Sequence, residues 1–153
     1  MRQLVFLGFL LSSLLACASG YRARFELDSK NFKEGIRFVE FKTASVDVAY
    51  KVIDADENNV TFNVYFTNIS KRTMTVDRAT FYIVSLSSKE TVNSEDPDDI
   101  SGVDKSDFLT KSVLKPRESA SGHVRFSLKE AGGRWVLKNK LTSNSFYFAV
   151  KEE

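Results

Sequence analysis

Alternation of apolar and polar residues with a period of two is the feature that most limits how this chain can fold. It is clearest in residues 59–68, NVTFNVYFTN. One parity holds Val60, Phe62, Val64 and Phe66, and the other holds Thr61, Asn63, Tyr65 and Thr67. Successive side chains of a strand point to opposite faces, so this pattern predicts a strand with one buried and one exposed face. No stretch of the chain keeps helical periodicity for three turns.

Short runs of similar composition follow one another along the rest of the chain. They lie at residues 36–42, 45–53, 79–86, 122–128, 134–139 and 145–150. The run at 36–42 has apolar residues on both parities, which predicts a β-bulge or burial on two sides. About seven to nine short strands separated by turns predict an all-β fold, namely an antiparallel β-sandwich. Its core is expected to include Val60, Phe62, Val64, Phe66, Phe81, Val124 and Phe126.

The N-terminal segment differs in composition from the rest of the chain. Arg2 is followed by a run of apolar and small residues that ends at Cys17, the only cysteine of the 153 residues. This run is shorter than the roughly 20 residues that a membrane-spanning helix needs. A basic start, a short apolar centre and small residues at the end are typical of a secretory signal peptide. Without a second cysteine the folded part has no disulfide, so it depends on burial for its stability.

The sequence Leu14-Leu15-Ala16-Cys17 resembles the lipobox of bacterial lipoproteins. The resemblance implies that residues 1–16 are removed as a lipoprotein signal peptide and that Cys17, acylated, becomes the mature N-terminus. Leu15 is larger than the Ala or Ser usual at that position. Stable anchoring takes two or more acyl chains, which a diacylglyceryl group and an N-acyl chain would supply. The alternative is an ordinary secreted protein with a chance cysteine.

Acylation of Cys17 predicts a location in the cell envelope, with the lipid bilayer as a partner. Ala18 after the cysteine favours the outer membrane if the host has one; otherwise the outer face of the cytoplasmic membrane is expected. No cofactor is expected beyond the covalent lipid. Residues 17–35 are polar and mixed, which predicts a tether in which residues 24–27 could form a first strand. Residues 36–153 are predicted to form the sandwich domain.

The charge balance excludes one class of partner. The chain has 22 Lys and Arg residues against 20 Asp and Glu residues, and both signs are interspersed. Such a balance gives no general electrostatic field for nucleic acid. No nucleic-acid partner is therefore expected.

A second resemblance covers about residues 45–128. An alternating strand that ends in Asn-x-Ser, a strand with Phe81 where the family has a Phe-x-Val/Leu pattern, and later Leu-x-Pro-x-Glu and Gly-x-Val-x-Phe sequences resemble an immunoglobulin-like domain of unassigned function found in bacterial envelope lipoproteins. The matching residues are Asn68, Ser70, Asp77, Phe81, Leu114, Pro116, Glu118, Gly122, Val124 and Phe126. Arg117 stands where the family usually has Gly, which implies a different turn there. The family implies a secreted sandwich that binds something, and the matching residues are expected to specify the fold rather than a site.

The sequence offers no catalytic or zinc-binding pattern. His123 is the only histidine, and its parity places it on an outer face without an evident nucleophile or orienting partner. Zinc sites need three or four His, Cys or carboxylate ligands. Ser112 and Lys115 have the S-x-x-K spacing of serine acylases, but Pro116 disfavours the helical turn which that mechanism needs. The protein is therefore expected not to be an enzyme.

Two sets of residues are candidate ligand contacts. The long polar segment 87–107 carries Glu95, Asp96, Asp98 and Asp99, whose carboxylates would suit calcium or a basic partner. The preferred interpretation is a solvated, mobile loop that holds no metal. Outward parities of the strands carry Tyr65, Tyr82 and Tyr147. Tyrosine is enriched at binding surfaces, but it also packs well at half-buried sheet positions.

Two functions are compatible with these features. The first is a non-enzymatic binding or recognition module for a protein or envelope ligand. The second is a structural or accessory subunit of an envelope complex. The oligomeric state stays open at this point.

Overall fold

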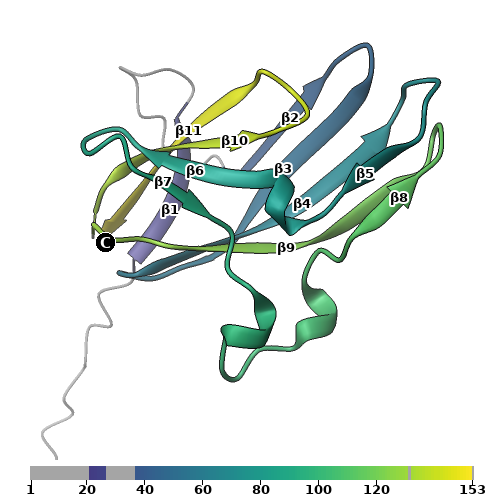
Figure 1. Cartoon of the computed structure of the whole chain (residues 1–153). Coiled ribbons are helices and arrows are strands. Elements are labelled where there is room, and N and C mark those ends of the chain that lie inside the picture. The colour runs from purple at the N-terminus through teal and green to yellow at the C-terminus, as the bar shows by residue number, and fades with distance from the viewer. Residues whose placement is uncertain (1–20, 27–36, 131, 153) are drawn as a thin grey trace, which may run out of the picture.

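The computed structural model describes residues 21–26, 37–130 and 132–152, and these form two antiparallel sheets packed face to face (Figure 1). The five-stranded sheet has the order β1 (Tyr21–Glu26), β11 (Ser145–Glu152), β10 (Arg134–Asn139), β6 (Phe81–Ser85) and β7 (Thr91–Asn93). The four-stranded sheet has the order β2 (Phe38–Lys42), β3 (Val46–Ala55), β4 (Asn59–Asn68) and β9 (Ser119–Ser127). A separate ribbon pairs β5 (Met74–Val76) with β8 (Ser112–Leu114).

The predicted all-β antiparallel sandwich is confirmed. Eleven strands are present in the described residues, together with three short 3-10 helices: η1 (Arg78–Thr80), η2 (Pro97–Asp99) and η3 (Lys105–Asp107). The number exceeds the seven to nine strands expected from the sequence. The additional strands β5, β7 and β8 have three residues each, too few for a recognisable alternation.

The predicted core is also confirmed. The inward parities of β3, β4 and β9 are buried, together with Phe81 of β6. Aromatic rings join the two sheets: Phe62 lies 5.1 Å from Phe148 and 5.6 Å from Phe25, measured between ring centroids. Aromatic side chains that are fully removed from water supply much of the stability of a core of this kind.

The described part of the run at 36–42 is the strand β2, which is buried on one side only. The strand β2 pairs with β3 in an unbroken register, Val39 and Phe41 pack on the core, and Phe38 is 51% exposed. The prediction of a bulge or two-sided burial there was wrong, because β2 is an edge strand whose outer face meets solvent. The register irregularity lies instead in β3, between Val52 and Asp54.

The N-terminal strand β1 lies within the segment 17–35 that was predicted to be a tether. It pairs with β11 from Tyr21 to Glu26, and Phe25 belongs to the core. Cys17 and the predicted signal peptide 1–16 lie outside the described residues. Among the residues that are described, no helix is both long enough and apolar enough to cross a bilayer.

The turn between β8 and β9 keeps a left-handed residue without using glycine. Glu118 N–H donates to the carbonyl of Lys115 at 3.1 Å, which closes a β-turn around Pro116 and Arg117. Arg117 has φ of 70°, a value that the third residue of a type II turn requires and that glycine adopts most readily. An arginine thus occupies a position that glycine would fill without strain, and its backbone is strained.

The buried side chain of Asn68, at the end of β4, holds three parts of the chain together. Its Nδ2 donates to the carbonyls of Arg72 and Leu114 at 2.7 and 2.9 Å, and its Oδ1 accepts from the N–H and the hydroxyl of Ser70. A fully buried amide with these partners joins β4, the turn that follows it and β8. This agrees with the expectation that Asn68 and Ser70 specify the fold.

Candidate functional site

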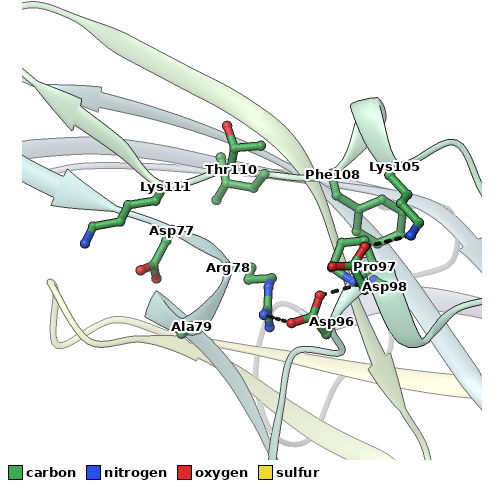
Figure 2. Close-up of a pocket in the computed structure, with 11 residues that line it drawn as sticks. Asp77, Arg78, Ala79, Asp96, Pro97, Asp98, Lys105, Phe108, Thr110 and Lys111 are labelled. Atoms are coloured by element: carbon green, nitrogen blue, oxygen red, sulfur yellow. Dashed lines mark hydrogen bonds and ion pairs between the residues drawn. The ribbon is translucent and has the colours of Figure 1, made fainter.

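An open pocket of about 420 Å³ lies beside the start of η1, where the segment between η2 and β8 passes over it (Figure 2). Its lining residues come from two parts of the chain and are Asp77, Arg78, Ala79, Asp96, Pro97, Asp98, Lys105, Phe108, Leu109, Thr110 and Lys111. Charged groups of both signs stand above apolar surface. Phe108 and Leu109 are buried and form the apolar part.

One wall of the pocket is set by η1. Asp77 precedes this short helix, and its backbone carbonyl accepts a hydrogen bond from Thr80 N–H at 3.1 Å. The carbonyl of Arg78 accepts from the hydroxyl of Ser94 at 2.7 Å, which fixes η1 against the segment after β7. From this position the guanidinium of Arg78 reaches the carboxylate of Asp96, as Figure 2 shows.

The opposite wall is built from two tight turns with aspartate caps. Asp96 Oδ1 accepts from Asp98 N–H at 3.1 Å at the start of η2, and Asp104 Oδ1 accepts from Ser106 N–H at 2.9 Å at the start of η3. An ion pair of 2.6 Å between Lys105 Nζ and Asp98 Oδ1 joins the two turns. The hydrogen bond from Lys105, and then the charge of Lys105, lower the pKa of Asp98. The same hydrogen bond, and then the charge of Asp98, raise the pKa of Lys105.

The segment that carries these turns is fixed to the free edge of β9. Glu95 N–H donates to the carbonyl of Arg125 at 2.8 Å, and Leu109 N–H donates to that of His123 at 3.0 Å. The side chains of Glu95 and Arg125 add a half-buried ion pair of 3.1 Å. The part of the chain from Glu95 to Leu109, which contains η2 and η3, is therefore attached to β9 at its first and last residues.

Gly122 makes this attachment possible. A Cβ atom at this position would lie 2.5 Å from the nitrogen of Leu109 and 2.6 Å from its Cα. Only glycine therefore lets the backbone at Leu109 approach β9 closely and place the leucine side chain in the core. The Gly in the predicted Gly-x-Val-x-Phe sequence thus has a packing role.

The structure separates the four predicted acidic contacts. Asp96 and Asp98 line the pocket, whereas Glu95 turns towards Arg125 on β9 and Asp99 is not part of the lining. No group of three or more His, Cys, Asp or Glu side chains is arranged to hold a metal ion within the described ranges.

The three candidate tyrosines do not converge on one site. Tyr65 is exposed on the outer face of the four-stranded sheet, where its hydroxyl accepts from Asn63 Nδ2 at 2.8 Å. Tyr82 and Tyr147 are half-buried on the outer face of the five-stranded sheet, on β6 and β11 with β10 between them. The sandwich therefore separates Tyr65 from the other two.

Sequence reasoning missed most of the pocket. Arg78, Lys105, Phe108 and Lys111 were not among the candidate contacts, although they line it together with Asp96. Arg78 and Asp96 are 18 residues apart, and their pairing depends on how η1 packs against the segment after β7. Two aspartates in helix-capping positions, Asp96 and Asp104, were the only local signal of ordered turns in this segment.

Comparisons with known proteins support the fold. No protein-family model matches this chain, and no curated protein sequence matches it. A candidate lipoprotein (ycdA) from Bacillus subtilis superposes on 74% of the chain with a TM-score of 0.51 and 17% identity. The match spans only 38% of that protein. The yjhA protein from Bacillus subtilis covers 69% of this chain, with a TM-score of 0.50 and 13% identity, and 84% of its own length is matched. At these identities the similarity concerns the fold alone.

Proposed function

We propose that this protein is a lipid-anchored, non-enzymatic binding module of the bacterial cell envelope. The lipobox-like sequence from Leu14 to Cys17 supports the anchor, and a candidate lipoprotein among the structural neighbours is consistent with it. The resemblance of residues 45–128 to an immunoglobulin-like domain of envelope lipoproteins supports the binding role. In this proposal the acyl chains on Cys17 hold the sandwich at the membrane.

The observation that carries the binding role is the pocket between η1 and the segment that follows η2. It is open, its floor is apolar, and charges of both signs are held in fixed positions around it. A ligand for this pocket has to offer both charged and apolar groups within a small area, and a segment of another protein does so. We therefore propose a protein ligand, with Arg78, Asp96, Lys105 and Phe108 as contacts.

Mass spectrometry tests the anchor. The protein extracted from membranes should begin with an acylated Cys17 and carry no residue before it. The variant Cys17→Ser should lose the acyl chains and leave the membrane fraction. Retention of this variant in membranes at the wild-type level would contradict the lipid anchor.

Site-specific photo-crosslinking in living cells tests the pocket. A photoreactive amino acid replaces the exposed Ala79 at the rim of the pocket, and the matched control carries it at the exposed Glu57 in the turn between β3 and β4. A discrete adduct that forms from position 79 and not from position 57 is expected. Equal adducts from the two positions, or none from position 79, would contradict binding at this pocket. A resident partner recovered in stoichiometric amount would identify an accessory subunit.

A further inference from the structure

The two outer faces of the sandwich differ in charge. On the five-stranded sheet, the alternation that buries Ala23, Phe25, Trp135, Leu137 and Phe148 leaves the other parity outside. Among the residues whose side chains the structure describes, the charged ones at these outward positions are Arg22 and Arg24 of β1, Lys151 of β11, and Arg134 and Lys138 of β10. All five of these side chains are basic. Glu152, at the end of β11, has the inward parity.

The outer face of the four-stranded sheet is mixed by comparison. Its outward positions carry Glu40 and Lys42 on β2, Asp47, Lys51 and Asp54 on β3, and Arg125 on β9. Lys42 pairs with Glu40 at 3.4 Å, and Arg125 pairs with Glu95. Of the two outer sheet faces, the described side chains therefore give a net positive charge only to that of the five-stranded sheet.

The strand register gathers four of the basic residues into one patch. Arg22 lies opposite Lys151, and Arg24 and Arg134 both lie opposite Ala149 from its two sides. Neighbouring strands are about 4.8 Å apart and alternate residues about 6.8 Å apart, so the four Cα atoms fall within roughly 10–12 Å. We call Arg22, Arg24, Arg134 and Lys151 the basic patch. These side chains also make intramolecular interactions, so the net charge of the face is what acts on a partner.

The basic patch lies close to the proposed anchor. Arg22 follows Cys17 by five residues, and five extended residues span at most roughly 18 Å. The strand β1 is at the edge of its sheet, beside β11 and then β10 (Figure 1). An acylated Cys17 would therefore keep Arg22, at the near end of the basic patch, within about 18 Å of the headgroups, roughly two Debye lengths at physiological salt.

We propose that the outer face of the five-stranded sheet docks on anionic phospholipid headgroups of the membrane in which the protein is anchored. The proposal rests on the lipid anchor at Cys17. Basic side chains beside a lipid anchor act as a second membrane-binding signal. Tyr82 and Tyr147 lie on the same face, and tyrosine favours the headgroup level of a bilayer. Docking turns the opposite sheet, with Tyr65, away from the membrane.

Amine footprinting of the lipidated protein in vesicles tests this orientation. The protein is reconstituted into vesicles of phosphatidylcholine alone or with about 30% phosphatidylglycerol, and acylation of each lysine is followed by mass spectrometry. In the anionic vesicles, the chemical labelling rate of the Lys151 amine should fall at least about threefold, and about 0.5 M salt should restore the rate seen with phosphatidylcholine alone. Lys51, on the opposite face, is the internal control and should not change.

Charge variants provide the second arm. Arg22→Gln combined with Arg24→Gln should abolish the protection of Lys151. Lys42→Gln combined with Lys71→Gln removes the same charge elsewhere and should leave the protection intact. The thermal unfolding midpoint of each variant establishes that it is folded.

The outcomes separate the two proposals. A chain that fails to float with phosphatidylcholine vesicles contradicts the anchor, and the docking proposal falls with it. A chain that floats with both kinds of vesicle, but in which Lys151 and Lys51 respond alike or salt has no effect, overturns the docking proposal alone.

Discussion

The side-chain amide of Asn139 donates a 3.0 Å hydrogen bond to the hydroxyl of Tyr50 across the interior of the sandwich. The two residues are 89 positions apart and belong to different sheets, on β10 and β3. Asn139 Nδ2 also donates to Thr142 Oγ1 at 2.9 Å, and its Oδ1 accepts from the N–H groups of Leu141 and Thr142. This amide therefore joins the two sheets and holds the turn after β10.

Tyr50→Phe should destabilise the protein by about 1–3 kcal/mol, because it removes the acceptor of a buried donor while preserving the ring. Urea unfolding followed by tryptophan fluorescence measures the change in the free energy of unfolding. The control Tyr147→Phe removes a hydroxyl from a half-buried outer face and should change that free energy by less than about 0.5 kcal/mol. Equal effects of the two substitutions would contradict the role of the cross-sheet hydrogen bond.

Stability should decrease at alkaline pH in a way that depends on Tyr50. Burial raises the pKa of its hydroxyl well above the ordinary tyrosine value. A raised folded-state pKa gives a contribution that is complete below the unfolded value of about 10 and is lost as the pH rises above it. The unfolding midpoint measured between pH about 9 and about 11 should fall less steeply in Tyr50→Phe than in the wild type. Parallel curves would refute this.

Gly122→Ala should displace the backbone at Leu109 from β9, since the added Cβ would overlap it. Overpacking of this kind costs about 1–3 kcal/mol. The amide hydrogens of Leu109 and Glu95 should exchange faster, because their hydrogen bonds to β9 weaken. Ser121→Ala, at the exposed neighbouring position, is the matched control. Unchanged exchange at Leu109 in the Gly122 variant would show that the chain accommodates the methyl group elsewhere.

Arg117→Gly should stabilise the protein by up to about 1 kcal/mol. A residue with a Cβ atom is strained in the left-handed region, and glycine is not, although its greater freedom in the unfolded chain offsets part of the gain. Arg117→Ala is the decisive control, because alanine keeps the Cβ atom and should bring no such gain. Thermal unfolding compares the three proteins, and equal midpoints for Gly and Ala would rule out relief of backbone strain.

Lys105→Gln should raise the pKa of Asp98 towards the ordinary aspartate value, because the hydrogen bond and charge that lower it are removed. A lowered folded-state pKa gives a contribution that is present above the unfolded value and is lost as the pH falls through the folded one. Carboxyl chemical shifts followed by NMR report the titration of Asp98 directly. The pKa of Asp104 should stay low in this variant, since Ser106 causes its shift.

The sequence predicted the fold correctly where a single strand was long enough to show the alternation of apolar and polar residues. The alternation in β3, β4 and β9 predicted the buried face of each strand, because a period of two depends only on neighbouring residues. It was uninformative for β5 and β8, since three-residue strands show no period. The left-handed conformation of Arg117 could not be read from the residue type, because hydrogen bonds to the backbone of Asn68 hold the turn in place despite the strain.

The candidate site was predictable only in part, for a physical reason. Asp96 and Asp98 could be named because acidic residues stand together in the sequence. Their counter-charges meet them only after the chain has folded: Arg78 lies in η1, 18 residues before Asp96, and Lys105 pairs with Asp98 across the two capped turns. The attachment of Glu95 and Leu109 to β9 likewise depends on backbone groups, which every residue carries and which leave no trace in composition.

The covered edge of β9 has a consequence that the proposed lipid anchor would make more important. An anchored protein would be confined to a bilayer surface, where molecules meet far more often than in solution, and exposed strand edges are the sites at which sheets of neighbouring molecules join. Glu95 and Leu109 occupy the backbone acceptors of Arg125 and His123 that an incoming strand would use. The segment that builds the pocket thus also closes this edge of β9 to the strand of a neighbouring molecule.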